Sequence, residues 1–356
     1  MAYTTIDDPT LYFQTVLYAG NGSADHAITL PGDTDMQPDT VWIKNRDATD
    51  PHCLFDSVRG VTKLLNPDDE RVEATDTDTL DAFQSDGFRV DADVQVNTSS
   101  EDYVAWCWKA GTTSGITTDG STTITPSAYS FNATSGHSII SFDGNATAGA
   151  GLPHGLGKKP HFAILKRRGT DNGWWVYLEG NTSAPETDYQ VLDHALATVD
   201  AATAWNDTAP STTNLFLGTA DHVNAADAHM AWIWTSIQGY SKVGGSYVGN
   251  GNADGPFIFT GFRPAWLMIK NVTETQGWEM WDNKRSPSNS GGKILAANTT
   301  AAERSNETWA ALDFLSNGFK IRYNDALNNN SGITYSYIAF AEAPFVNSNG
   351  VPCNAR

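Results

Sequence analysis

One pattern of four ordered blocks recurs three times along the chain, and this repetition constrains the fold more than any other feature. The first block opens with a short strand and a turn, written LYAGNGS at 17–23, SFDGNAT at 141–147 and SYVGNGN at 246–252. It continues with a proline that precedes an apolar segment, and a lysine ends that segment six residues later, giving Pro38 with Lys44, Pro160 with Lys166, and Pro264 with Lys270. Such order and spacing predict three copies of one structural unit.

Three further blocks follow, and the second copy departs from the other two. The next apolar segment reads CLFDSVRG at 53–60, WWVYLEG at 174–180 and WEMWDNKR at 278–285. In copies 1 and 3 an aspartate stands three residues before an arginine, as Asp56 with Arg59 and Asp282 with Arg285, and copy 2 lacks this pair. The block LDAFQSDGFRV (80–90) or LDFLSNGFKI (312–321) is reduced to TTNLFLG (212–218) in copy 2. The last block, YVAWCW, HMAWIW or YIAFAE, holds an alanine at its third position: Ala105, Ala231 and Ala339.

The composition of these blocks is typical of β-strands. The segments that end at the three lysines are short and rich in Val, Ile, Trp and Phe. A proline suits the first position of a strand, and the GNG, SDGF and SNGF sequences favour tight turns. The last blocks are apolar on both faces, which indicates burial on both sides. The sequence therefore predicts an all-β fold of three tandem antiparallel β-sandwich repeats, jelly-roll-like and arranged like beads, with only short helices, around 61–65 and 294–304.

The predicted boundaries follow the copies. Repeat 1 covers 17–112, repeat 2 covers 137–238 and repeat 3 covers 239–346. A Thr/Ser/Gly-rich linker is expected over 113–136 and a C-terminal tail over 347–356. An N-terminal arm is expected over 1–16. Its apolar residues Leu11, Tyr12 and Phe13 predict that it either docks onto a neighbouring subunit or closes a sheet of its own chain.

Charge and cysteine content exclude several classes of partner. The chain has 41 Asp and Glu against 22 Lys and Arg, a net charge of −19, which repels nucleic acid and anionic lipid. The first residues lack the basic and apolar regions of a signal peptide, and no apolar run is long enough for membrane insertion, so cytoplasmic synthesis is expected. Cys53, Cys107 and Cys353 are far apart, which argues against a disulfide framework or a zinc site.

Two repeated polar features are candidates for binding a glycan. The pairs Asp56 with Arg59 and Asp282 with Arg285 could hydrogen-bond sugar hydroxyls, but a turn held by a charge pair is the favoured interpretation. The three lysines could bind an acidic glycan, but a lysine at a strand end more often extends into solvent and protects the sheet edge.

Other candidates are a calcium loop and a set of exposed aromatic residues. Asp76, Asp78 and Asp81 alternate as calcium ligands do, but the sequence lacks the central glycine and the closing glutamate of such a loop. Tryptophan side chains can stack on sugars, yet most of the tryptophans lie inside apolar strands, which favours core packing: Trp106, Trp108, Trp174, Trp175, Trp232, Trp234, Trp278 and Trp281.

No catalytic motif supports an enzyme. GxSxG, HxH and HxxxH are absent, and GLPHGLGKK at 151–159 is neither a P-loop nor a dinucleotide fingerprint. No cofactor, no catalytic residue and no metal ligand is therefore predicted, and the binding residues stay undefined. A carboxylate pair for glycan hydrolysis can be assembled in space from distant residues, so a glycan depolymerase stays open as the less favoured alternative.

The segments TLYFQTVLYAGNGS, PDTVWIKNRD, LFDSVRGVTKLL, SDGFRV and YVAWCWKAG resemble an uncharacterised repeat domain of tail fibre and other virion proteins of marine tailed phages. The resemblance spans about residues 9–345 and implies a virion structural protein, bound to other virion proteins and exposed on the virion surface. The expected function is that of a tail fibre or spike that attaches to a host-surface glycan. The alternative is a capsid decoration protein that stabilises the shell. Trimerisation is expected only by analogy with phage fibres.

Overall fold

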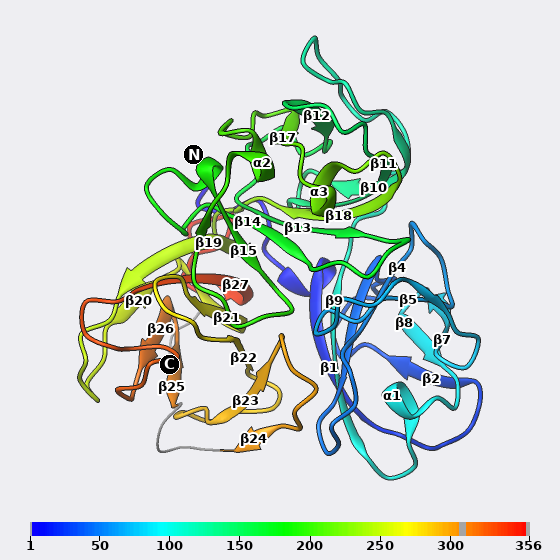
Figure 1. The fold of residues 1–356 in the computed structure, drawn as a ribbon. Coiled ribbons are helices and arrows are strands. Elements are labelled where there is room, and N and C mark those ends of the chain that lie inside the picture. The colour runs from blue at the N-terminus through cyan, green and yellow to red at the C-terminus, as the bar shows by residue number, and fades with distance from the viewer. Residues whose placement is uncertain (1, 306–310, 354–356) are drawn as a thin grey trace.

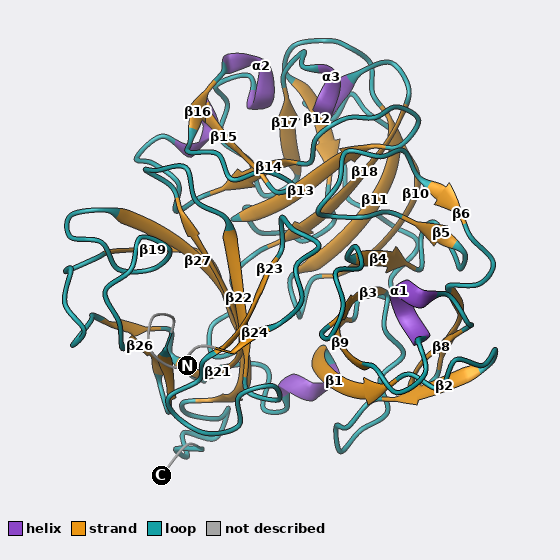
Figure 2. Cartoon of the chain, turned by 60° about the horizontal axis from the view of Figure 1, so that its bottom comes forward, coloured by secondary structure: helices purple, strands orange, loops and turns teal. Residues whose placement is uncertain are grey.

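The computed structural model describes residues 2–305 and 311–353. Strands account for 41 % of the residues and helices for 5 %, which confirms the predicted all-β class. The strands form three large and several small antiparallel sheets, and the large sheets lie around a common centre (Figures 1 and 2). Within the described residues no helix has the length and apolar character needed to span a membrane.

The first large sheet has the strand order β1-β9-β3-β4. Its strands are β1 (Phe13–Ala19), β9 (Asp102–Trp108), β3 (Thr40–Asn45) and β4 (Cys53–Asp56). A smaller sheet of β2 (His26–Thr29), β8 (Gly87–Val90) and β7 (Leu80–Gln84) faces it across a buried cluster that includes Ile43, Phe88 and Ala105. The short strands β5 (Lys63–Leu64) and β6 (Ala74–Thr75) pair beside β4.

The second large sheet has the order β10-β11-β18-β13-β14-β15-β16. Its strands are β10 (Pro126–Asn132), β11 (His137–Asp143), β18 (Ala228–Trp234), β13 (Phe162–Arg167), β14 (Trp175–Leu178), β15 (Asp188–Val191) and β16 (Val199–Asp200). The pair β12 (Ala150–Pro153) and β17 (Asn214–Leu217) shares a buried cluster with it that includes Leu152, Leu165 and Leu215.

The third large sheet has the order β19-β27-β21-β22-β23-β24. Its strands are β19 (Ser241–Val248), β27 (Thr334–Pro344), β21 (Phe262–Asn271), β22 (Trp278–Asp282), β23 (Lys293–Ala296) and β24 (Arg304–Ser305). A smaller sheet of β20 (Phe257–Phe259), β26 (Gly318–Ile321) and β25 (Leu312–Leu315) shares a cluster with it that includes Leu267, Phe319 and Ala339.

The repeated sequence blocks occupy the same positions in all three large sheets. In each one the strand of the last block lies between the opening strand and the strand that ends at the repeated lysine, with antiparallel pairing on both sides. The three alanines of the last block are completely buried and belong to the three separate clusters.

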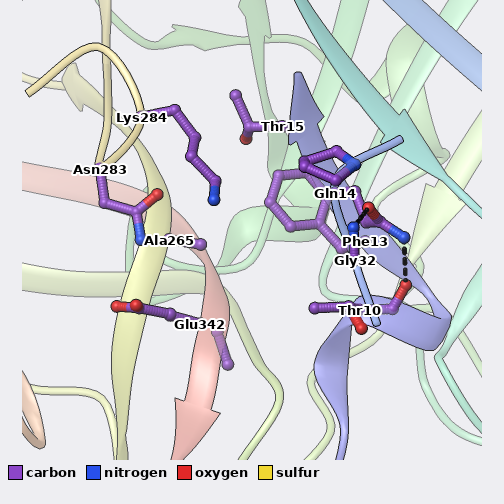
Figure 3. Close-up of a pocket in the computed structure, with 11 residues that line it drawn as sticks. Thr10, Phe13, Gln14, Thr15, Gly32, Ala265, Asn283, Lys284 and Glu342 are labelled. Carbon is purple, nitrogen blue, oxygen red and sulfur yellow. Dashed lines mark hydrogen bonds between the residues drawn. The ribbon is translucent and has the colours of Figure 1, made fainter. Parts of the chain in front are cut away.

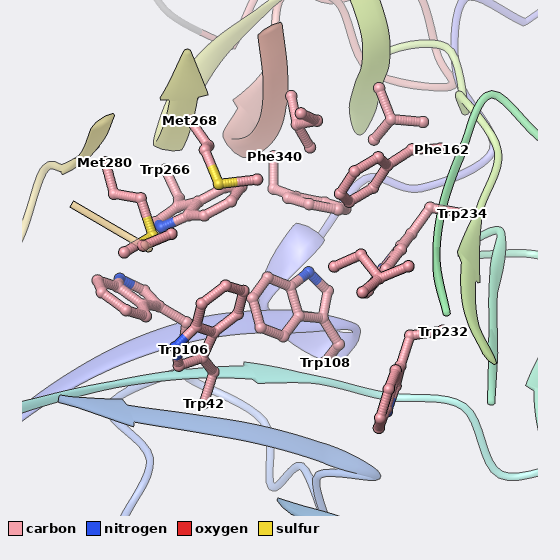
Figure 4. Packing of buried hydrophobic residues seen from close by; sticks show 14 of the residues in the cluster. Trp42, Trp106, Trp108, Phe162, Trp232, Trp234, Trp266, Met268, Met280 and Phe340 are labelled. Carbon is pink, nitrogen blue, oxygen red and sulfur yellow. The ribbon is translucent and has the colours of Figure 1, made fainter. Parts of the chain in front are cut away.

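A fourth buried cluster, called here the central cluster, takes side chains from all three large sheets (Figure 4). It is rich in aromatic residues: Phe13, Trp42, Trp106, Trp108, Phe162, Trp232, Trp234, Trp266 and Phe340 are among its members. The expectation of separate beads is therefore wrong. The last-block strands are apolar on both faces because one face packs on the smaller sheet and the other packs on the central cluster.

Equivalent contacts join the three large sheets in a closed ring. The residue eight positions after each repeated lysine carries a ring nitrogen that meets a backbone carbonyl of another copy, in a strand at Ala296 and Val191 and in a loop at Asp69. Trp174 Nε1 donates to Asp69 O at 2.9 Å, and Trp278 Nε1 donates to Val191 O at 2.8 Å. His52 Nε2 lies 3.1 Å from Ala296 O, and it carries the proton because Nδ1 accepts from Trp42 Nε1. The contact between His52 and Ala296 joins the first sheet to the third and so closes the ring.

Several predicted boundaries need correction. The expected linker over 113–136 contains strand β10. This strand pairs with β11 at the edge of the second large sheet, and Ser130 is its buried residue. The expected arm over 1–16 ends in strand β1, which pairs with β9 of its own chain, so closing an own-chain sheet is the alternative that the structure adopts. Of the expected tail over 347–356, residues 354–356 lie outside the described residues, and Ser348 bonds to Asp7.

The helices were also placed wrongly. The segment 61–65 contains strand β5, and 294–304 contains β23 and the start of β24. The α-helices of the described chain are α1 (Val94–Asn97), α2 (Ala202–Trp205) and α3 (Asp221–Asn224), and the 3-10 turns are η1 (Pro9–Leu11) and η2 (Pro185–Thr187). Within 294–304 residues 294–296 and Arg304 are in strands, where sheet pairing overrides local helix propensity, and residues 297–303 form turns and loop.

Candidate functional site

The two Asp-x-x-Arg pairs are buried and do not face solvent. Arg59 Nε lies 2.6 Å from Asp56 Oδ2, and both side chains are 0 % exposed, as are those of Asp282 and Arg285. Asp56 Oδ1 also accepts the backbone N–H groups of Val58 and Arg59, which closes a turn. The favoured interpretation, a turn held by a charge pair, is confirmed.

Each pair also connects two large sheets. The guanidinium of Arg59 lies 5.4 Å from the ring centre of Trp232, and that of Arg285 lies 5.6 Å from the ring centre of Trp106. Trp106 Nε1 donates to Asp282 Oδ2 at 3.2 Å.

Two glutamates extend these contacts to further arginines. Glu73 pairs with Arg59 and with Arg168, and Glu303 pairs with Arg285 and with Arg46. Burial opposes the ionisation of Glu73, but the guanidinium groups of Arg168 and Arg59 outweigh it, so the pKa of Glu73 is lowered. These buried ion pairs therefore hold neighbouring parts of the ring together.

The repeated lysines are also internal, and the prediction that they extend into solvent is wrong. Lys44, Lys166 and Lys270 are each 0 % exposed. Their ammonium groups donate to backbone carbonyls: that of Lys166 to Glu70 O and Asn172 O, and that of Lys270 to Leu196 O, Asn271 O and Gln276 O. Burial lowers the pKa of Lys44 and of Lys166 to about 8, and that of Lys270 to about 7.

The three aspartates considered as calcium ligands, and disfavoured for lack of the glycine and glutamate of such a loop, are not brought together in the structure. Asp81 lies near Asp25 and Asp91, not together with Asp76 and Asp78. Arg89 pairs with both Asp25 and Asp81, so a guanidinium already neutralises that group of carboxylates. The Asp76 side chain instead accepts the N–H of Asp78 within a turn.

The tryptophans that the sequence assigned to the core are all buried. Two phenylalanines that the sequence analysis did not single out are exposed instead. Phe257 is 46 % exposed and Phe259 is 58 % exposed, on either side of the buried Ile258 in edge strand β20. They are the candidates for surface recognition in this chain, because exposed aromatic groups are costly to leave in water.

The rings of Phe257 and Phe259 lie on a surface formed by the smaller sheet of β20, β26 and β25. We call it the outer-sheet surface and define it as Phe257, Phe259, Asp313, Leu315, Lys320 and Arg322. Phe257 lies opposite Lys320, which lies opposite Asp313, while Phe259 lies opposite Gly318. Lys320 Nζ bonds to Asp254 at 2.7 Å, and Arg322 Nε bonds to Asp313 at 2.6 Å. Apolar rings and charged groups therefore stand side by side.

Pockets flank this surface on the same part of the chain. One of about 500 Å³ is lined by Arg263, Ser288, Asn289, Leu315 and Asn317, among others. A pocket of about 480 Å³ lies on the other side of Asn289 and includes Asp313 and Arg322. Asn289 lines both pockets. Its side-chain amide is held in place by two hydrogen bonds of 3.0 Å with the backbone of Phe314.

A smaller pocket lies where β1 meets β21 and β27 (Figure 3). Its volume of about 70 Å³ has room for only a few water molecules. Gln14 closes one side of it, since its amide donates to Thr10 O at 2.9 Å and accepts from Gly32 N at 2.7 Å. This pocket is too small to accommodate a sugar.

Sequence reasoning also missed three buried asparagines that hold the opening turns. Asn97, Asn224 and Asn329 are completely buried. Their side-chain oxygens accept the N–H groups of Asn21, Asn145 and Asn250, and their amides donate to the carbonyls of Ser23, Thr147 and Asn252. The available signal was an asparagine shortly before each last block, in segments that are otherwise dissimilar.

The chain belongs to a family whose model matches residues 8–344 and is described as a domain of unknown function (DUF7483). The match covers the three copies as one unit. Neither a curated protein nor a solved structure matches the chain.

Proposed function

We propose that this member of the DUF7483 family is an exposed structural protein of a phage virion, of the tail-fibre or spike kind, that attaches to a host-surface glycan. The single observation that carries the attachment role is the exposed Phe257 and Phe259 pair on the outer-sheet surface. The virion assignment rests on the sequence resemblance stated above.

We further propose that the chain consists of three tandem, jelly-roll-like β-sandwich repeats. The common strand order of the large sheets supports this, and so does the buried cluster that each large sheet shares with a smaller one. The repeats enclose the central cluster, so the ring acts as a rigid scaffold that displays surface loops and edge strands.

The use of the charged residues supports a binding role over a catalytic one. The Asp-x-x-Arg pairs and the lysines, which the sequence repeats, are engaged in internal contacts. The outer-sheet surface offers flat aromatic rings for the apolar face of a sugar, and Lys320 and Arg322 offer donors for hydroxyl groups. Binding of this kind is weak at one site, and oligomerisation of the chain, as a trimer by analogy with fibres, would raise it through avidity.

Repeat 1 shows which residues can replace the two exposed phenylalanines. In repeat 1, Ala27 pairs with Arg89 and Thr29 pairs with Gly87, in the positions where Phe257 pairs with Lys320 and Phe259 with Gly318. The double variant Phe257→Ala, Phe259→Thr therefore keeps a residue type that this fold already accepts at each position. Val94→Ala is the control, because Val94 is 57 % exposed on α1, in repeat 1.

The test measures binding of the purified chain to immobilised bacterial surface polysaccharides, together with immunogold labelling of virions. We expect the double variant to bind about tenfold or more weakly, as for loss of an aromatic anchor, and Val94→Ala to bind as the parent chain does. Label at the tail is the expected position. Label over the head would replace this proposal with the capsid decoration alternative, and equal binding by the double variant would remove the glycan surface from Phe257 and Phe259.

A further inference from the structure

A second cluster of polar groups lies far from the outer-sheet surface, where the first and second repeats meet. It consists of Glu70, Asp193 and His194, and one donor atom from each lies within 4.8 Å of the others. Glu70 comes from the loop between β5 and β6, while Asp193 and His194 directly follow β15. No sequence motif marks this cluster, because Glu70 lies more than a hundred residues before the adjacent Asp193 and His194.

The central observation is the state of the Asp193 carboxylate. Its side chain is 0 % exposed. One oxygen, Oδ1, accepts the N–H of Trp174 at 2.9 Å. The other, Oδ2, accepts no hydrogen bond from the described residues, and it lies 3.3 Å from His194 Nδ1. A buried carboxylate oxygen without a donor is unfavourable unless a cation or a further ligand completes it.

The surrounding backbone holds the two loops together before any ion binds. Glu70 O accepts the N–H of Asn172 at 2.8 Å and also accepts from the ammonium group of Lys166. Trp174 Nε1 donates to Asp69 O at 2.9 Å. The Glu70 loop is therefore fixed against the second repeat, while the side chains of Glu70 and His194 stay exposed, so that an ion can enter from solvent.

The spacing suits one small divalent cation. Donors that bind a tetrahedral zinc ion at about 2.0–2.2 Å lie roughly 3.3 Å from one another. The separation of 3.3 Å between Asp193 Oδ2 and His194 Nδ1 matches that edge. Glu70 Oε1 lies 3.8 Å from the other ring nitrogen, His194 Nε2, and the three donor atoms all lie within 4.8 Å of one another, so the exposed Glu70 side chain completes the set by turning towards the ion. An imidazole with two carboxylates favours Zn²⁺ and similar transition ions over Ca²⁺, which prefers oxygen donors alone.

We propose that Glu70, Asp193 and His194 form a divalent transition-metal site, with Zn²⁺ as the representative ion, that clamps repeat 1 to repeat 2. Water fills the remaining coordination position. The competing description is a salt bridge between protonated His194 and Asp193 that needs no ion. The two descriptions differ in whether Zn²⁺ binds and whether it changes stability.

The test titrates Zn²⁺ alone into the full chain by calorimetry, in a Cys353→Ser background, because Cys353 is an exposed thiol that would bind zinc independently. We expect one ion per chain, a rise in the unfolding temperature when Zn²⁺ is added, and much weaker binding of Ca²⁺. His194→Gln, Glu70→Gln and Asp193→Asn should each weaken Zn²⁺ binding at least tenfold. The Asn side chain keeps the oxygen that accepts from Trp174, and positions 70 and 194 are exposed, so these variants should fold.

Asp25→Asn provides the matched control, since it alters the other acidic group, in which Arg89 already supplies the positive charge. It should leave Zn²⁺ binding unchanged. Co²⁺ absorption of the parent chain adds a readout of the coordination: intense visible bands are expected from a site of low coordination number. Absence of saturable Zn²⁺ binding would overturn the proposal, and so would binding that persists in both His194→Gln and Asp193→Asn.

Discussion

Replacing Arg285 alone should destabilise the chain more than replacing the whole buried group to which it belongs. Arg285 Nε lies 2.5 Å from Asp282 Oδ2, and Arg285 Nη2 donates to Met280 O at 3.0 Å. Arg285→Asn would leave the Asp282 carboxylate buried without its guanidinium. Removal of one partner of a buried pair costs about 3–5 kcal/mol, so we expect a loss of about 4 kcal/mol in the free energy of unfolding.

The comparison is a triple variant that copies residues from other repeats. Counting from the repeated lysines, Leu178 and Asn181 take the positions of Asp282 and Arg285, and Phe340 takes the position of Trp106 within the last block. The variant Asp282→Leu, Arg285→Asn, Trp106→Phe removes the buried charge and also the indole N–H that donates to it. The Met280 carbonyl still loses its donor, so we expect a residual loss of about 1–3 kcal/mol.

Equilibrium unfolding in urea, followed by tryptophan fluorescence, measures both values, and an unchanged m-value would show that the comparison is between similar states. The difference between the single and the triple variant is the informative quantity because both lack Arg285. A loss below about 1 kcal/mol for Arg285→Asn would refute the reasoning, since that value is typical of a solvated surface pair. Equal losses for the two variants would also refute it, since the buried carboxylate would then not be the cause.

Two further predictions concern the other internal polar groups. Burial lowers the pKa of Lys270 in the folded chain to about 7, below its value of 10.5 when unfolded, so the folded state binds fewer protons between these values and stability should rise with pH through that window. Urea unfolding between pH 7 and pH 9.5 should show this rise, and Lys270→Met should reduce it, while Lys44 and Lys166, whose pKa values are lowered to about 8, keep part of it. Asn329→Leu should cost about 1–3 kcal/mol in the free energy of unfolding, because the N–H of Asn250 and the carbonyls of Asn252 and Tyr323 would lose their partner. Thermal unfolding checks this, and a loss well below about 1 kcal/mol would show that water replaces the amide.

The strands were accessible from the sequence because they depend on local pattern, whereas their order within the sheets was not predicted. Pro38 and Pro160 lie just before β3 and β13 as predicted, whereas Pro264 lies inside β21, where the pairing with β27 is irregular. The two-sided apolar character of YVAWCW indicated burial on both faces. The pattern does not say what covers the second face. Lys166 illustrates the consequence: at the end of a strand it is expected to extend into solvent, yet a loop of another repeat covers it and supplies the carbonyl of Glu70.

The candidate sites were harder to predict from the sequence, because they depend on contacts between distant residues. Phe257 and Phe259 flank a buried isoleucine in a strand of three residues, and only the register with Gly318 and Lys320 places both rings outside. Glu70 and Asp193 are brought together by contact between repeats, which no spacing in the sequence encodes. Helix propensity was misleading at 294–304, because the edge of the third sheet offers strand pairing to a run of alanines.

The divergence of the second copy becomes intelligible once the copies are placed in a ring. At two junctions the backbone N–H of a glutamate meets the carbonyl of an arginine two residues after a repeated lysine, Glu73 with Arg168 and Glu303 with Arg46, and the side chains of each couple also pair. At the third junction the same backbone contact joins Thr198 to Val272, without an ion pair.

At the third junction the buried residues next to this backbone contact are apolar as well. Leu178 replaces the aspartate, and Phe340 replaces the tryptophan. The indole N–H of Trp106 donates to Asp282, whereas that of Trp232 at the remaining junction has no hydrogen-bond partner among the described residues. Leu178 and Phe340 both belong to the central cluster, so an apolar pair stands where the other junctions bury a charge pair under an aromatic ring. A buried polar group that lacks some of its partners costs more free energy than a complete group or than its replacement by apolar residues, so the aspartate, arginine and glutamate are expected to be lost together. The missing Asp-x-x-Arg pair of copy 2 is therefore one part of a coordinated change at a single junction.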